Sequence, residues 1–172
     1  MQRTRFHRWP CPIARAADVF GDGWTQIVMR EAFYGCRRFA DFQQNLGMSR
    51  ATLGHRLNHL VAEGMLERVR YQSAPARYEY RLTEKGRAFF DVLAAMWRFG
   101  EDWLFRQGPP VRLVDRQSGD LIKPVVVDEQ SGQRIDLRRI GVELRDGTPL
   151  DAEARRRPND RGGKRRSKFQ GR

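Results

Sequence analysis

The side chains of residues 49–63 that could contact a ligand follow a helical spacing. The segment reads SRATLGHRLNHLVAE, and its large apolar residues recur at intervals of three, four and one, which predicts a helix buried along one stripe. These apolar residues are Leu53, Leu57, Leu60 and Val61. At about 100° per residue, the opposite face carries small or hydrogen-bonding side chains. The candidates on that face are Ala51, Thr52, His55, Asn58 and His59.

Such a face suits the major groove of double-stranded DNA, which admits a helix and is read by hydrogen bonds to base edges. Ser49 is a good N-cap residue, and with Arg50 it stands where a helix dipole favours phosphate. The alternative is a solvated helix face with no ligand. Arg56 lies between the two faces, so it could also brace the fold.

Directly after this helix, the period at which apolar residues recur changes from 3.6 residues to 2 residues. MLERVRYQ (65–72) and RYEYRL (77–82) alternate, and SAPA between them supplies a turn, which predicts a β-hairpin. Four arginines on it are candidate contacts to DNA phosphates, together with Ser49 and Arg50. They are Arg68, Arg70, Arg77 and Arg81. The alternative is a surface hairpin that is basic without binding DNA.

Helical patterns are also expected over 12–20, 24–33, 39–46 and 83–105. Three helices, a turn, a recognition-type helix and a hairpin form the order of a winged helix-turn-helix. The expected fold is therefore mainly α with a small β-hairpin wing. The expected domains are a basic N-terminal arm (1–10), the winged helix-turn-helix domain (11–106), a small β-rich appendage (109–150) and a disordered basic tail (151–172).

The positive charge is concentrated in that tail. Lys and Arg total 33 and Asp and Glu total 21, giving a net charge of +12, and residues 155–172 hold nine basic residues against Asp160 alone. A segment with so little to bury is expected to be disordered. One interpretation is an arm that binds nucleic-acid phosphates and adds affinity without sequence specificity. The alternative is a terminus that only increases solubility.

The last helical pattern is apolar over nearly half its circumference, more than the roughly 100° stripe that packing within one small domain needs. Aromatic residues are enriched at protein interfaces, so we expect a homodimer; deep burial in one core is the alternative. The candidate interface residues are Trp97, Phe99, Trp103 and Leu104.

Other classes of function find little support. We expect no enzyme, cofactor or metal, because the chain has no phosphate-binding glycine loop and no metal-spaced cluster of histidine and cysteine. No apolar run approaches the roughly 18 residues of a membrane helix, and no leader opens the chain, so a cytoplasmic, nucleoid-associated protein is expected. The rival functions are a winged-helix adaptor that binds protein and a non-specific nucleic-acid binder driven by the tail.

Three stretches resemble the HxlR-type winged helix transcription regulators: CPIARAADVFGDGWT, RRFADFQQNLGMSRATLGHRLNHLVAEGML and PARYEYRLTEKG. The resemblance covers about residues 11–105. It implies a homodimer that binds an inverted-repeat operator through one winged unit per subunit. The effector is unknown.

The resemblance also implies a role for Cys11, because some members of this family use a cysteine at the matching position as a thiol switch. Cys11 precedes a predicted helix, and the helix dipole with Arg8 and Arg15 would favour its reactive thiolate. The alternative is an inert, partly buried thiol. Cys36 matches no family position.

Gln-Ser-Gly occurs twice in the appendage, at 117–119 and 130–132, where hairpin turns are expected. Some related regulators resemble zinc ribbons here, with Cys-Gly knuckles. If that likeness holds, serines replace the thiols and the segment binds no zinc.

Overall fold

The computed structural model describes residues 5–147 and residue 149. The chain divides into two compact units. One is Asp22–Ile135, and the other contains the described residues before Asp22 and after Ile135. The expected disordered tail at 151–172 lies outside the described residues, and the basic arm at 1–10 is described only from Arg5 onward.

Helix α1 (Pro12–Phe20) belongs to the unit that contains the first described residues. Pro12 occupies its first turn, where the missing N–H needs no partner. The Asp18 carboxylate accepts a hydrogen bond of 2.7 Å from the backbone N–H of Phe6. This bond ties the segment before α1 back onto the helix.

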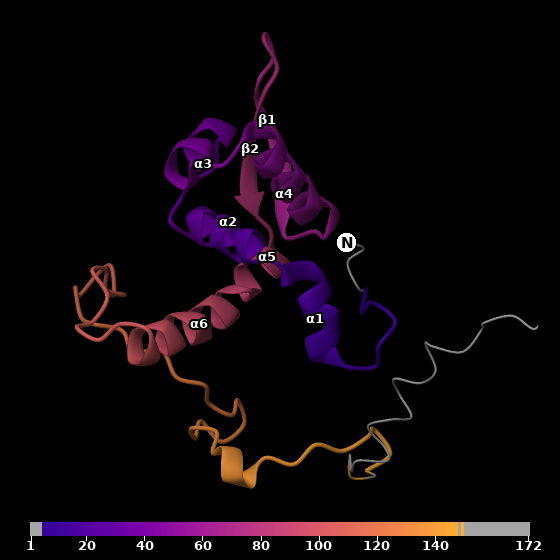
Figure 1. Cartoon of the computed structure of the whole chain (residues 1–172), viewed down its shortest axis with the longest axis vertical. Helices are drawn as coiled ribbons and strands as arrows, with labels where there is room; N and C mark the ends of the chain where they lie inside the picture. Colours follow the sequence, from indigo (N-terminus) through magenta and orange to yellow (C-terminus); the bar gives the residue numbers. More distant parts are fainter. Residues whose placement is uncertain (1–4, 148, 150–172) are drawn as a thin grey trace, which may run out of the picture. The chain divides into compact units, whose positions relative to one another are not determined.

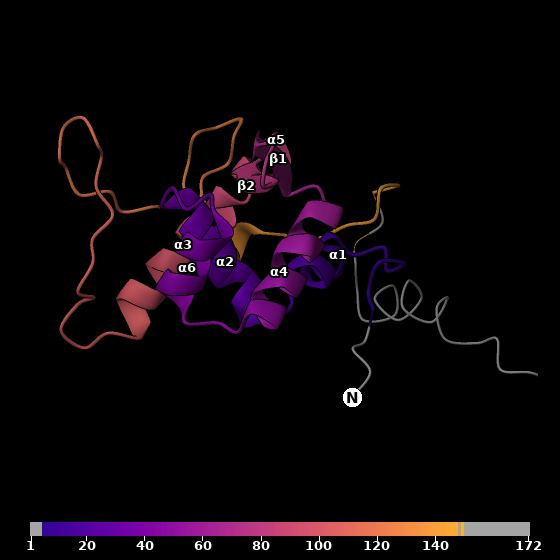
Figure 2. The same cartoon turned by 90° about the horizontal axis from the view of Figure 1, so that it is seen from above.

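Three helices open the other unit: α2 (Gly23–Phe33), α3 (Phe39–Leu46) and α4 (Arg50–Ala62). Asp22 caps α2 and Ser49 caps α4 through side-chain oxygens, as N-cap residues do. Gly47 ends α3 in the left-handed conformation at φ +61°, which permits the sharp turn into α4. Helix α2 packs against both α3 and α4 (Figures 1 and 2).

The core of this unit lies where α2, α3, α4 and the hairpin meet. Leu53, Leu57 and Leu60 are fully buried, which confirms the leucine stripe of α4, whereas Val61 is half-buried at its edge. Other fully or almost fully buried side chains are Val28, Met29, Phe42, Met65 and Leu66.

The hairpin is present as expected. β1 (Leu66–Gln72) and β2 (Arg77–Leu82) are antiparallel, with Leu66 opposite Leu82 and Arg70 opposite Tyr78. The register shifts between Arg70 and Gln72, near the tip. Figure 1 shows that this tip extends beyond α3 and α4, as a wing does.

The predicted continuous helix over 83–105 is wrong in one respect, because it is broken at Phe89. The structure has a short α5 (Glu84–Ala88) followed by α6 (Phe90–Trp103). The N–H of Phe89 bonds to the carbonyl of Gly86, three residues back, at 3.2 Å. This tighter turn buries Phe89 while Gly86 stays against Met65 and α6 packs along α2.

The expected β-rich appendage has less regular structure than its sequence predicts. Instead of strands it holds isolated bridges, Val114 with Leu121 and Val127 with Arg134 in one unit, and Glu143 with Pro149 in the other. A 3₁₀ turn at Leu137–Arg139 is its single helical element among the described residues. Both Gln-Ser-Gly stretches are turns, as expected, with Gly119 at φ +79° and Gly132 at φ +65°.

Within residues 5–147 and 149, no helix is long and apolar enough to span a bilayer. The same residues contain no group of three or more His, Cys, Asp or Glu side chains that could hold a metal ion.

Candidate nucleic-acid interface

The polar face of α4 is open to solvent along most of its length. Ala51, His55 and Asn58 are exposed, while Thr52 and His59 are half-buried. The stripe Leu53, Leu57 and Leu60 holds the opposite side of the helix against the core. The buried leucines thus fix the rotation of α4, and that rotation presents hydrogen-bonding groups outward, one turn apart.

Ser49 and Arg50, at the amino end of α4, already make contacts within the protein. The Ser49 hydroxyl accepts a hydrogen bond of 3.2 Å from the N–H of Thr52, and the two hydroxyl oxygens lie 2.9 Å apart. Arg50 is exposed, with its guanidinium 5.3 Å from the centre of the Phe39 ring. Arg50 therefore remains at the surface, on a fixed apolar support.

Arg56 braces the fold, which was one of the two interpretations that its position on the helix allowed. Its Nη1 donates to the Asp22 carboxylate at 3.0 Å. Asp22 also accepts from the N–H and hydroxyl of Thr25. The pair therefore links the start of α2 to the middle of α4.

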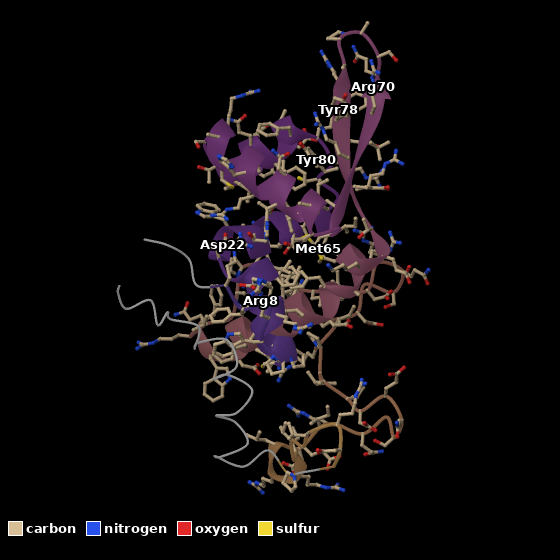
Figure 3. All side chains as sticks on the ribbon, turned by 90° about the vertical axis from the view of Figure 1, so that its right-hand side faces the viewer. Arg8, Asp22, Met65, Arg70, Tyr78 and Tyr80 are labelled. Carbon is tan, nitrogen blue, oxygen red and sulfur yellow. The ribbon has the colours of Figure 1, made fainter. Side chains whose placement is uncertain are left out.

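The wing arginines are distributed over both faces of the hairpin. Arg68 and Arg70 lie opposite Tyr80 and Tyr78, so these four share one face, and Arg81 lies on the other. The Arg68 guanidinium stacks 3.8 Å from the centre of the Tyr78 ring. Figure 3 shows Arg70 and Tyr78 near the tip, beyond Tyr80.

Each wing arginine has a different local constraint. Arg70 donates to the carbonyls of Gln72 and Ser73 at 3.2 and 2.6 Å, which holds the tip in shape. Arg81 is paired with Glu79 at 2.6 Å. Arg77 is exposed, and the described residues offer it no ion-pair partner. Arg77 is thus the wing cation with most freedom to meet a phosphate.

Arg38 is a candidate that sequence reasoning missed. It forms an isolated bridge with Glu79, and its guanidinium lies 5.0 Å from the centre of the Tyr71 ring. This places an exposed cation from the start of α3 beside the wing. Its only sequence signal was the Arg-Arg pair before Phe39, which says nothing about proximity to a later hairpin.

Helix α6 is apolar on two opposite faces. Phe90, Leu93, Ala94 and Trp97 point toward α2, where the rings of Phe90 and Phe33 have centres 5.4 Å apart. On the other side, Phe99 is 61% exposed and Trp103 is 76% exposed. Leu104 directly follows the helix and is 70% exposed, but its spacing puts it on the side of Leu93 and Trp97. Of the four candidate interface residues, Trp97 therefore lies on the inner face and the other three are open.

The two cysteines have different surroundings. Cys11 is half-buried at the start of α1, and its Sγ accepts from the N–H of Ala14 at 3.5 Å. Cys36 lies 3.7 Å from a carboxylate oxygen of Glu31 and accepts from Asn45 at 3.2 Å. Burial raises the pKa of the Cys36 thiol, and the Glu31 charge raises it further. Cys36 is therefore held as a neutral hydrogen-bond donor.

A helix-turn-helix whose second helix presents a polar face, followed by a basic hairpin, defines a winged-helix DNA-binding protein of the kind that regulates transcription. Comparison with known proteins agrees with this class. The model of the HxlR-like helix-turn-helix family matches residues 19–108. The chain belongs to the HxlR-like helix-turn-helix family.

Its relatives include an uncharacterized HTH-type transcriptional regulator of Mycobacterium tuberculosis. The two are 39% identical over 132 residues, which span 76% of this chain and 84% of the relative. A second such regulator, from Synechocystis sp., is 41% identical over 95 residues, or 55% of this chain and 70% of the relative.

Solved structures extend the similarity beyond the winged unit. PA1607, a candidate transcription factor, superposes with a TM-score of 0.66 at 38% identity, covering 96% of this chain and 99% of its own. The reduced form of the redox regulator HypR has a TM-score of 0.50 at 30% identity, and covers 54% of this chain and 92% of its own.

Proposed function

We propose that this transcription regulator binds an inverted-repeat operator as a homodimer, with α4 of each copy in the major groove. The observation that carries the proposal is the exposed row of Ala51, His55 and Asn58 on α4, a helix that also contacts strand β1 of the wing. Asn58 suits an adenine edge, to which an amide can form two hydrogen bonds. The half-buried Thr52 and His59 complete the base-reading surface.

The phosphate contacts come from both ends of this surface. Ser49 and Arg50 lie at the amino end of α4, where the dipole and a free cation favour an anion. Arg77 and Arg70 lie near the wing tip and Arg68 along it, with Arg81 on the opposite face. Arg38 joins this set through its contact with Tyr71.

The proposal is tested on DNA that the wild-type protein selects from a random-sequence pool. Replacing Asn58 with Ala removes a base contact and should weaken binding by roughly 5- to 150-fold. Gln130→Ala, which removes an exposed amide far along the chain from α4, is the control. Equal affinities for N58A and the wild type, or a selected pool without an inverted repeat, would contradict the proposal.

The wing is tested by the salt dependence of the same complex. Arg77→Ala should reduce the slope of log affinity against log salt by about 0.9 for each phosphate that the variant no longer neutralises. Arg112→Ala removes an equally exposed charge outside the wing and should leave the slope unchanged. Removal of residues 151–172 distinguishes the rival functions, since a tail-driven binder would lose all binding and a winged reader would keep its choice of sequence.

We also propose that Cys11 makes DNA binding responsive to oxidants or electrophiles. Its support is the position of the thiol at the amino end of α1 and the similarity to the redox regulator HypR. Diamide should release the wild-type protein from DNA but leave Cys11→Ser bound. Cys36→Ser is the control and should respond as the wild type does, because Cys36 is held neutral beside Glu31. Equal sensitivity of DNA binding to diamide in C11S and the wild type would contradict this proposal.

A further inference from the structure

A cavity of about 380 Å³ lies between α2, α6 and the chain that follows α6. All of its walls belong to the unit Asp22–Ile135. Cavities that hold small organic ligands begin at roughly 300 Å³, so this one has room for a molecule of one or two fused rings.

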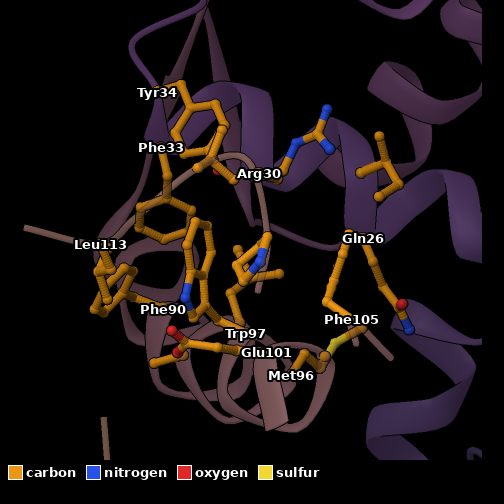
Figure 4. Close-up of a pocket in the computed structure, with 16 residues that line it drawn as sticks. Gln26, Arg30, Phe33, Tyr34, Phe90, Met96, Trp97, Glu101, Phe105 and Leu113 are labelled. Carbon is orange, nitrogen blue, oxygen red and sulfur yellow. The ribbon is translucent and has the colours of Figure 1, made fainter. Parts of the chain in front are cut away.

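The walls of the cavity are rich in aromatic side chains. Phe33 and Tyr34 come from the end of α2, Phe90 and Trp97 from α6, and Phe105 from the residues after it. Figure 4 shows Phe33, Phe90 and Trp97 together with Leu113 on one side of the space. Aromatic faces attract flat apolar groups, and they also attract cations through the negative charge of the ring faces.

The charged side chains of the cavity favour one sign of ligand. Arg30 contributes mainly its stem, because its guanidinium donates to Glu31 at 2.6 and 3.1 Å and points away from Trp97 (Figure 4). Glu101 lies beside Trp97 and forms no ion pair with any described residue. The positive charge of Arg30 is therefore neutralised by Glu31, whereas the carboxylate of Glu101 has no ion-pair partner among the described residues.

We propose that this cavity binds a small aromatic molecule that carries one ammonium group, with its ring against Trp97 and Phe90 and its charge facing Glu101. The aromatic walls stabilise both halves of such a ligand, since they bury the ring and attract the cation. An anion of the same shape would meet the uncompensated carboxylate of Glu101. This inference is independent of DNA binding, because occupancy of the cavity can be measured without DNA.

Three probes that share one ring system test the proposal by isothermal titration calorimetry on the full chain. They are 1-naphthylmethylamine, which is protonated at pH 7, neutral 1-naphthalenemethanol, and anionic 1-naphthoate. The amine should bind roughly 3- to 10-fold more tightly than the alcohol, as expected for a partly exposed ammonium near a carboxylate and aromatic rings. The naphthoate should bind most weakly.

Two variants locate the binding. Ala94→Phe fills the cavity from α6 and should weaken the amine and the alcohol alike by at least about tenfold, since a bulky ring removes the space that they occupy. Ala95→Phe places the same ring on the exposed side of α6 and should change neither affinity. Far-ultraviolet circular dichroism verifies that both variants fold.

Glu101→Gln tests the charge with little effect on packing, so it decides the matter even if A94F does not fold. It should reduce the preference for the amine over the alcohol to the smaller part that the aromatic rings supply, and leave the affinity for the alcohol unchanged. The control Glu129→Gln should change neither affinity. The proposal is overturned if naphthoate binds most tightly, if E101Q prefers the amine as strongly as the wild type does, or if no probe shows saturable binding.

Discussion

At the scale of single residues, a buried carboxylate joins two helices of the winged unit. Glu31 on α2 is 5% exposed, and its two oxygens accept hydrogen bonds from Arg30 and from Asn45 on α3. Cys36 also donates to it at 3.7 Å. Burial raises the pKa of Glu31, but the hydrogen bonds from Asn45 and Arg30 outweigh that effect, so the pKa lies below its ordinary value.

Replacing Glu31 with Gln should destabilise the protein by about 1–3 kcal/mol at pH 7. The variant loses the negative charge and one of the two carboxylate oxygens that accept hydrogen bonds from Arg30, Asn45 and Cys36. The folded-state pKa is lowered, so the stabilising effect is present above the unfolded value of about 4.3 and is lost as the pH falls through the folded value. Urea unfolding of wild type and variant measures the difference.

The gap between the two unfolding free energies should therefore be constant from pH 7 to about pH 5 and shrink below about pH 4. Glu129→Gln, on an exposed turn, serves as the control with no effect at any of these pH values. An unchanged gap at low pH would show that Glu31 acts through its shape and not its charge.

At the scale of elements, the wing and α5 are joined by a close backbone contact. Gly86 is buried at the start of α5, and a Cβ atom there would lie 2.0 Å from the carbonyl oxygen of Met65. Thr83 caps the same turn by accepting from the N–H of Gly86 at 2.9 Å. The glycine of the Thr-Glu-Lys-Gly stretch is thus required by packing and not by an unusual backbone conformation.

Gly86→Ala should cost about 1–3 kcal/mol of unfolding free energy, since the backbones of α5 and Met65 must separate. The matched change Gly54→Ala, in the middle of α4, meets no atom within 4 Å. It should instead stabilise the protein by about 0.5–1 kcal/mol, because alanine loses less backbone entropy in a helix than glycine. Chemical denaturation compares the two, and effects of the same sign would contradict this explanation.

At the scale of the whole molecule, the outer face of α6 is large, aromatic and uncovered in one copy of the chain. Phe99 and Trp103 are each more than half exposed. Exposed aromatic side chains that recur along one side of a helix are typical of protein interfaces. We infer that this face forms the homodimer, which leaves Trp97 to the inner side of the helix.

Trp103→Glu should therefore convert a dimer to a monomer of 20.1 kDa, because it places a charge in a buried apolar interface. Light scattering at micromolar concentration measures the mass. Trp103 is 76% exposed in the single chain, so the variant should still fold. Gln130→Glu adds the same charge at an exposed position outside α6 and should remain dimeric. A monomeric wild-type protein would refute the dimer outright.

Periodicity in the sequence sufficed to predict the winged helix-turn-helix, because local patterns decide which residues become helix or strand. The leucine stripe of α4 and the alternation of the hairpin each follow from spacing alone. The same spacing predicted the outward face with His55 and Asn58. The family resemblance over 11–105 rests on three stretches that include these positions, and it agrees with the match over 19–108.

Contacts between residues distant in sequence were decided only by the tertiary structure. The pairing of Arg56 with Asp22, the bridge from Arg38 to the wing and the cluster around Glu31 all join separate elements. The break at Phe89 and the cavity beside Trp97 likewise depend on how α5 and α6 pack against their neighbours. Local spacing fixes which side of an element is apolar, whereas the partner that covers it is fixed by packing of the whole chain.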